Sequence, residues 1–115
     1  MPPAQSEVDV VFVALGSLGD VAPLATLAGR LSAAGVASCR VVTHPEWRDC
    51  LSPRFAHLTA LHWHVVPSPV IWHETRGVSR SDSIAAELEC ILLACQGARC
   101  VVFNLQSCVG YHIAG

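Results

Sequence analysis

A turn containing two glycines, placed directly after an apolar segment, most strongly constrains what this chain can fold into. Residues 8–15 (VDVVFVAL) have the composition of a buried strand, and residues 16–23 (GSLGDVAP) follow them without a break. A strand that passes at once into a glycine turn and then into a helix is typical of parallel α/β sheets. The helix is expected to begin near Val21 and to end at Gly35.

Asp20 lies within this turn, at the predicted start of the helix. The free N–H groups and partial positive charge of a helix start are suited to phosphate, and here a carboxylate occupies that setting. Asp20 is therefore interpreted either as a helix N-cap or as a general base at the C-terminal edge of the sheet. The tight turn alone is enough to explain both glycines.

Size and composition exclude several classes of protein. A chain of 115 residues is one domain at most, and 52% hydrophobic with 14% charged residues is too apolar for disorder. No apolar run reaches the roughly 18 residues that span a bilayer. The first seven residues (MPPAQSE) lack the basic region and apolar core of a secretory signal.

Charge and cysteine usage narrow the class further. The net charge is −2 and the chain has no lysine, so no basic stripe is available for nucleic acid. None of the six cysteines forms a Cys-x-x-Cys pair, and we interpret them as reduced thiols of an intracellular protein, expected in the cytoplasm or peripheral to membranes. These are Cys39, Cys50, Cys90, Cys95, Cys100 and Cys108.

Strands and helices alternate along the chain. Strands are predicted at residues 8–15, 38–43, within 58–66, and at 100–103; helices at 21–35, 45–51 and from a cap at Ser81 or Asp82, with a further helix starting near Val109. The pattern predicts an α/β, Rossmann-like parallel sheet of order 3-2-1-4 with helices on both faces. Because the pattern stops inside the last helix, we expect the chain to be part of a larger domain.

Three motifs occur in a fixed order: residues 16–23 (GSLGDVAP), 43–49 (THPEWRD) and 112–114 (HIA). They resemble the opening loop, the Thr-His motif after the second strand, and the His-Ile-Ala motif after the fourth strand of GT-B glycosyltransferases. The nearest kinds are the sterol glucosyltransferases and the enzymes that decorate glycopeptide antibiotics. Gly115 stands where that family usually has Glu, and residues 58–79 are not recognisable. The resemblance implies the N-terminal, acceptor-binding part of such an enzyme, without its C-terminal donor domain.

The resemblance also implies a reaction. A hexose would pass from a nucleotide sugar such as UDP-glucose to a sterol, lipid or small apolar acceptor, by inverting displacement and with Asp20 as base. Gly16, Ser17 and Gly19 would shape the loop that faces the donor diphosphate. No tightly bound cofactor and no metal are expected, and the isolated chain is expected to be inactive because half of the cleft is missing.

Further residues are candidates for the acceptor side of this cleft. They are His44 at the end of the second strand, Trp72 and His73 in the loop after the third, and Asn104 and Gln106 in the loop after the fourth. A helix cap is the preferred alternative for His44, and packing against the core is an equal alternative for Trp72. His62 and His64 are expected to share one strand face, where a metal would need further ligands. Arg48 and Asp49 are expected to form a local ion pair.

Two other functions remain open. The chain is also consistent with a non-catalytic acceptor-binding subunit of a split glycosyltransferase. A dinucleotide-binding Rossmann module is less favoured, because the glycine pattern is Gly-x-x-Gly-Asp rather than Gly-x-Gly-x-x-Gly. The second strand also ends in Thr43 and His44 instead of an acidic residue.

Overall fold

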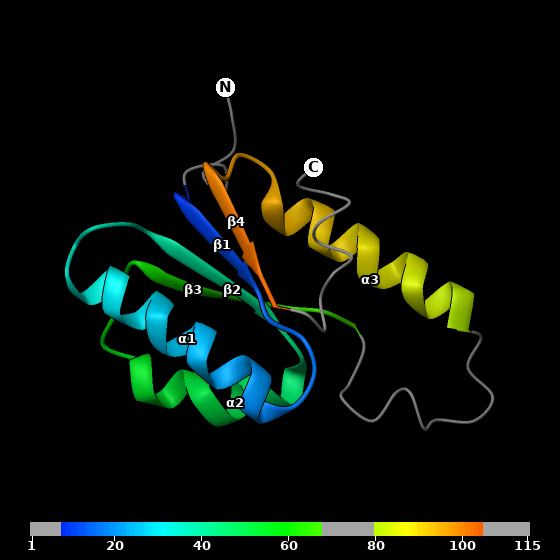
Figure 1. The fold of residues 1–115 in the computed structure, drawn as a ribbon, viewed down its shortest axis with the longest axis horizontal. Helices are drawn as coiled ribbons and strands as arrows, with labels where there is room; N and C mark the ends of the chain where they lie inside the picture. Colours follow the sequence, from blue (N-terminus) through cyan, green and yellow to red (C-terminus); the bar gives the residue numbers. More distant parts are fainter. Residues whose placement is uncertain (1–7, 68–79, 105–115) are drawn as a thin grey trace.

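The computed structural model describes residues 8–67 and 80–104, with side chains described from residue 85 onward in the second range. Four strands form one sheet in which all neighbours are parallel, in the spatial order β3-β2-β1-β4 (Figure 1). They are β1 (Val10–Val13), β2 (Cys39–Thr43), β3 (Leu61–Val65) and β4 (Cys100–Phe103). The predicted α/β, Rossmann-like fold with strand order 3-2-1-4 is confirmed.

The four strands begin in line with one another. Val10 of β1 pairs with Cys39 of β2 and with Cys100 of β4, and Cys39 pairs with Leu61 of β3. Their carboxyl ends therefore lie along one edge of the sheet, which is where ligands bind in open α/β sheets.

Helices cover both faces of the sheet, as predicted. On one face lie α1 (Leu18–Ala33), α2 (Pro45–Leu51) and the short 3₁₀ helix η2 (Ser52–Phe55), and on the other lies α3 (Arg80–Cys95) (Figure 1). The seven predicted residues of α2 are those observed.

Alternation along β1 divides the core between these two faces. Val11 and Val13 pack toward α3 in a cluster with Ile91 and Ala94, whereas Phe12 packs with Ala28 of α1. Both sets are almost completely buried. The almost entirely apolar segment that predicted this strand therefore reflects burial on both faces.

The boundaries of four elements differ from those predicted, and β2 begins at Cys39 and not at Ser38. β1 is shorter than residues 8–15, in part because the N–H of Leu15 bonds to a side chain instead of a neighbouring strand. α1 begins at Leu18 and not near Val21, because Ser17 is its N-cap. α3 begins at Arg80, so Ser81 and Asp82 lie inside its first turn instead of capping it. The helix expected near Val109 lies outside the described residues.

A buried arginine ties β2 to α3. Arg40 is 9% exposed, and its guanidinium Nη1 donates a hydrogen bond of 2.5 Å to the carbonyl oxygen of Ala94. Ala94 belongs to the last turn of α3, whose carbonyls have no partner within the helix and carry partial negative charge. Arg40 therefore supplies a hydrogen-bond donor to a carbonyl group at the C-terminal end of α3, the helix that covers the second face.

The cysteines of the described residues are free thiols: Cys39, Cys50, Cys90, Cys95 and Cys100. Burial raises the pKa of the thiols of Cys39, Cys90 and Cys95, so these three stay protonated near neutral pH. Cys108 lies outside the described residues.

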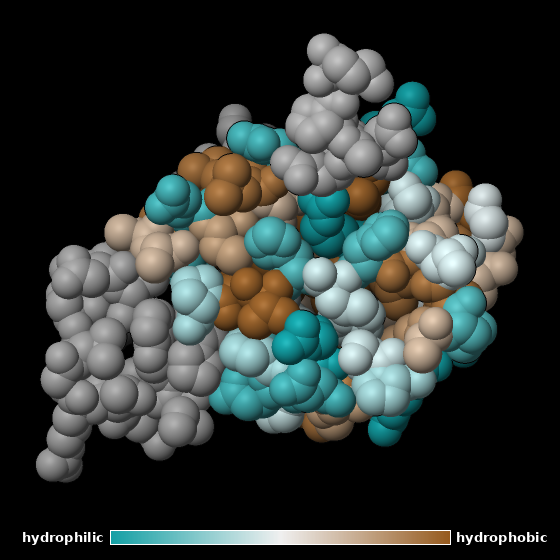
Figure 2. All heavy atoms as spheres, turned by 180° about the vertical axis from the view of Figure 1, so that it is seen from behind, coloured by the Kyte–Doolittle hydropathy of each residue, from teal (hydrophilic) through white to brown (hydrophobic). Residues whose placement is uncertain are grey.

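The surface is partly apolar. Leu92 and Leu93 of α3 are each about half exposed. On the face seen in Figure 2, apolar side chains form separate patches with polar side chains between them. In the part of the chain that the structure describes, no helix combines the length and the apolar character needed to cross a membrane.

Candidate functional site

The loop from β1 to α1 lies at the carboxyl edge of the sheet. Gly16 has a φ of 107°, a conformation that side chains rarely adopt, and Ser17 then caps α1 with an extended backbone. The predicted glycine requirement is therefore met at Gly16. It is not met at Gly19, which lies inside the first helical turn, where an added Cβ would approach nothing closer than 3.8 Å.

All four backbone polar groups of Leu15 and Gly16 bond to side chains from elsewhere in the chain. The Leu15 N–H donates to Oδ1 of Asn104 at 3.4 Å, and the Leu15 carbonyl accepts from Nδ2 of Asn104 at 2.8 Å. The Gly16 N–H donates to Nε2 of His44 at 3.0 Å, and its carbonyl accepts from Nε1 of Trp47 at 2.7 Å. We call these three side chains and their bonds the loop clamp.

His44 links the end of β2 to this loop. It is the N-cap of α2 and only 5% exposed. Because its Nε2 accepts a hydrogen bond from an N–H group, that nitrogen carries no proton, and the neutral ring is protonated on Nδ1. The helix-cap interpretation of His44 holds for its backbone, while its side chain holds Gly16.

Trp47 is the member of the loop clamp that sequence reasoning did not select as a site residue. It lies three residues after the N-cap of α2, so its indole is on the turn that carries His44. The only signal in the sequence was its place in the 43–49 motif, since an aromatic residue on a short helix otherwise predicts core packing. Its ring also packs with the cluster around Val21 and Leu51.

Asn104 follows directly after β4 and extends the sheet through its side chain. Its carboxamide pairs with both backbone groups of Leu15, as a neighbouring strand would, and Nδ2 also lies 3.3 Å from the carbonyl oxygen of Asp20. Asn104 therefore joins the end of β1 to the first turn of α1.

Asp20 is at the third position of α1 and is exposed. Its Oδ2 accepts hydrogen bonds from the Ser17 hydroxyl at 2.8 Å and from the Ser17 N–H at 3.3 Å. The residue that caps the helix is Ser17, so the N-cap interpretation of Asp20 is wrong; Asp20 instead closes a capping box. No hydrogen bond of Oδ1 is found among the described residues, so one oxygen supports the helix and the other is available.

Other predicted residues lie apart from this edge or outside the described residues. Arg48 and Asp49 form the expected exposed ion pair, with Nε and Oδ1 2.7 Å apart. Trp72, His73 and Gln106 lie outside the described residues, so their roles stay predictions.

His62 and His64 occupy alternate positions of β3, so they share one face as expected. Burial, with the charge of Arg40 beside it, lowers the pKa of His64. Within residues 8–67 and 80–104, no three His, Cys, Asp or Glu side chains are grouped closely enough to hold a metal ion.

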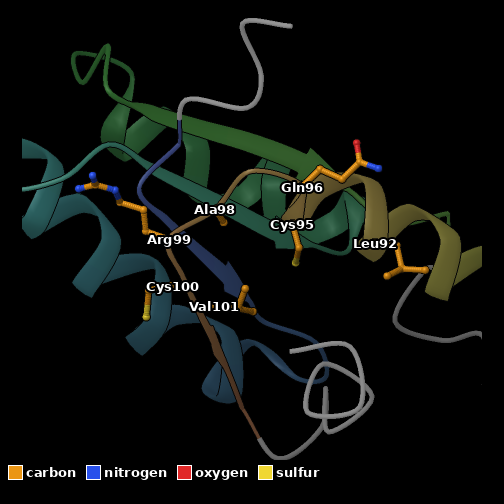
Figure 3. Close-up of a pocket in the computed structure, with 7 residues that line it drawn as sticks. All are labelled: Leu92, Cys95, Gln96, Ala98, Arg99, Cys100 and Val101. Carbon is orange, nitrogen blue, oxygen red and sulfur yellow. The ribbon is translucent and has the colours of Figure 1, made fainter. Parts of the chain in front are cut away.

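An open groove of about 400 Å³ lies at the opposite end of the sheet, where α3 ends and β4 begins (Figure 3). Leu92 and Cys95 of α3 and Arg99 and Val101 are among its lining residues. No carboxylate or imidazole lines it, so it offers no proton acceptor comparable to Asp20. We therefore place the candidate site at the carboxyl edge, around Gly16 and Asp20.

Comparison with protein-family models, with curated proteins and with solved structures finds no match to this chain. The candidate function therefore depends on the geometry of this edge and on the motifs of the sequence.

Proposed function

We propose that this chain is the acceptor-binding part of a nucleotide-sugar-dependent glycosyltransferase, with Asp20 as its general base. The motifs at residues 16–23 and 43–49 resemble those of GT-B sterol and glycopeptide glycosyltransferases. The proposal includes a cytoplasmic location and a sterol, lipid or small apolar acceptor. It also includes a separate domain or chain that holds most of the nucleotide sugar.

The observation that carries the proposal is that the two oxygens of the Asp20 carboxylate have different surroundings. Oδ2 is held by Ser17, and Asp20 as a whole is exposed at the carboxyl edge of the sheet. A carboxylate fixed through one oxygen keeps its orientation, which a general base needs before it can accept a proton. The loop clamp fixes the chain just before this carboxylate.

The chemistry that the resemblance implies uses this carboxylate as the base. Oδ1 of Asp20 accepts the proton of an acceptor hydroxyl as its oxygen attacks the anomeric carbon of the sugar. The new carbon–oxygen bond forms on the face of the sugar opposite the nucleoside diphosphate. The bond from the anomeric carbon to the diphosphate breaks, and the diphosphate leaves with the electron pair of that bond. The anomeric configuration is therefore inverted.

The first turn of α1 favours this function over a dinucleotide-binding module. The Gly16 N–H is bonded to His44 and the Ser17 N–H to Asp20, so neither group is directed at a dinucleotide pyrophosphate. By the same bonds, Gly16 and Ser17 shape the loop that faces the donor without donating these N–H groups to its diphosphate. A pyrophosphate bound at this helix start would also lie against the Asp20 carboxylate. A non-catalytic acceptor-binding subunit uses the same surface and differs only in not needing the Asp20 carboxylate.

Ligand titrations of the ¹⁵N-labelled chain test the proposal. A sterol delivered in methyl-β-cyclodextrin is expected to shift the amide signals of Ser17, Asp20 and Asn104, while empty cyclodextrin and NADH leave them unchanged. Shifts with NADH and none with the sterol would instead assign a dinucleotide-binding module. Turnover by the 115-residue chain alone would contradict the need for a separate donor-binding part.

A further inference from the structure

Gly16 is held on both sides of its Cα by a single short helix. Its N–H bonds to His44 and its carbonyl to Trp47, the N-cap and the third residue of α2. These two groups belong to the two peptide units that flank the Gly16 Cα. Fixing both groups therefore fixes the φ and ψ angles of Gly16, which as a glycine would otherwise have more backbone freedom than any other residue type.

We propose that His44 and Trp47 are positioning residues for Asp20: by holding Gly16, they set the direction in which the chain enters α1 and presents the Asp20 carboxylate. This inference rests on the proposed function for the role of Asp20, while the loop clamp itself is independent of it. His44 acts as a neutral imidazole protonated on Nδ1, because its Nε2 must accept the Gly16 N–H.

The contacts of Gly16 distinguish this role from ordinary core packing. His44 is 28 residues and Trp47 31 residues from Gly16, and both reach it through hydrogen bonds to the main chain. Only three residues separate Gly16 from Asp20, and that interval contains the capping box. A change of backbone angle at Gly16 therefore shifts the Asp20 carboxylate, and a displacement of about 1 Å in a catalytic group can lower a rate by about 10²-fold.

Nuclear magnetic resonance tests the loop clamp without any assay of activity. In the wild-type chain, the His44 ring is expected to show a protonated Nδ1 and an unprotonated Nε2. The amide of Gly16 and the indole N–H of Trp47 are expected to exchange slowly with solvent. A proton on Nε2, or fast exchange at both groups, would overturn the proposal.

Four variants separate positioning from packing. His44→Leu and Trp47→Phe remove one hydrogen bond each, whereas His44→Gln keeps an acceptor at similar reach. Trp63→Phe is the matched control, because the Trp63 ring packs against Phe55 and its indole makes no hydrogen bond in the described residues. We expect His44→Leu and Trp47→Phe to increase backbone motion at residues 16–20 and to leave the rest of α1 protected. His44→Gln and Trp63→Phe are expected to behave as wild type.

With an active assembly of chain and donor-binding part, the same variants address the reaction. His44→Leu and Trp47→Phe are expected to lower kcat about 10–100-fold and to change KM less than about threefold, with His44→Gln restoring most of kcat. Unchanged order at residues 16–20 in both hydrogen-bond-deleting variants would overturn the inference. If His44→Leu fails to fold, Trp47→Phe decides alone. Absence of any transfer by the wild-type assembly would contradict the proposed function. The loop clamp would still be tested by the backbone order measured at residues 16–20.

Discussion

Gly29 of α1 lies directly against the ring of Phe55 in η2. A Cβ built at Gly29 would be 2.5 Å from Cε1 and 2.7 Å from Cδ1 of that ring, well inside normal van der Waals contact. Phe55 in turn packs against Trp63 of β3, with ring centroids 6.4 Å apart. The absence of a side chain at position 29 therefore sets how closely α1 approaches the segment that follows α2.

Replacing this glycine with alanine is expected to destabilise the fold. Alanine favours a helix over glycine by about 1 kcal/mol, but the clash with Phe55 requires a shift that costs about 1–3 kcal/mol. We expect Gly29→Ala to have a net lower free energy of unfolding in urea. Gly19→Ala is the matched control, because its Cβ would meet only ordinary contact, and we expect it to be neutral or slightly stabilising. Equal stability gains in the two variants would contradict the close approach.

A second prediction concerns the hydroxyl of Thr43, at the carboxyl end of β2. Thr43 is fully buried, and no hydrogen-bond partner of its Oγ1 is found among the described residues. A buried hydroxyl without a partner costs about 1–3 kcal/mol, and valine has nearly the same shape without the hydroxyl. Thr43→Val is therefore expected to raise the free energy of unfolding by about 1 kcal/mol, measured in urea. A loss of stability would show that this hydroxyl has a partner in solution.

The arrangement of the strands could be predicted from the sequence because each strand carries its own signal. The apolar run of residues 100–103 and the glycine turn at Gly16 appear in the local sequence, and parallel crossovers leave few topologies. The observed start of α1 at Leu18 could also have been predicted, since Ser17 and Asp20 have the spacing of a capping box. Low helix propensity at Gly19 obscured that signal.

The loop clamp could not be predicted in the same way. Its bonds join residues 28 to 89 positions apart, and they depend on where β2 and β4 end relative to β1. His44 and Asn104 were selected for the correct edge of the sheet. Their observed partners are main-chain groups of Gly16 and Leu15, a pairing that only the register of the sheet determines.

A third prediction concerns stability at mildly acidic pH. Burial, followed by the charge of Arg40, lowers the pKa of His64 from its ordinary value of 6.5. As the pH falls through that ordinary value, the unfolded chain binds a proton at His64 before the folded chain does. Stability that is present above this pH is therefore lost as the pH falls toward the folded-state pKa.

Urea unfolding at pH 7.5 and 5.5 measures this loss. We expect wild type to be less stable at pH 5.5, and His64→Gln to lose less stability over the same interval because it has no proton to bind. A direct titration of the His64 ring by nuclear magnetic resonance gives the folded-state pKa. A value at or above 6.5 would contradict the effect of burial.

The fourth prediction concerns Asp20 in an active assembly of this chain with its donor-binding part. Asp20→Asn keeps the size of the side chain and an oxygen that accepts the Ser17 hydrogen bonds, but it cannot take a proton from an acceptor hydroxyl. We expect kcat to fall about 10²–10⁴-fold, the range for loss of a general base, with little change in acceptor binding. Loss of the negative charge near the start of α1 is expected to cost at most about 1 kcal/mol of stability.

Asp49→Asn provides the control for this substitution. Asp49 is also an exposed carboxylate, but its hydrogen bond is to Arg48 on α2 and it takes no part in the loop clamp. It is therefore expected to retain wild-type turnover. Near wild-type turnover in Asp20→Asn, with the same stability, would show that Asp20 serves only the capping box with Ser17. The non-catalytic acceptor-binding subunit would then be the better assignment, because that function uses the same edge of the sheet without a base.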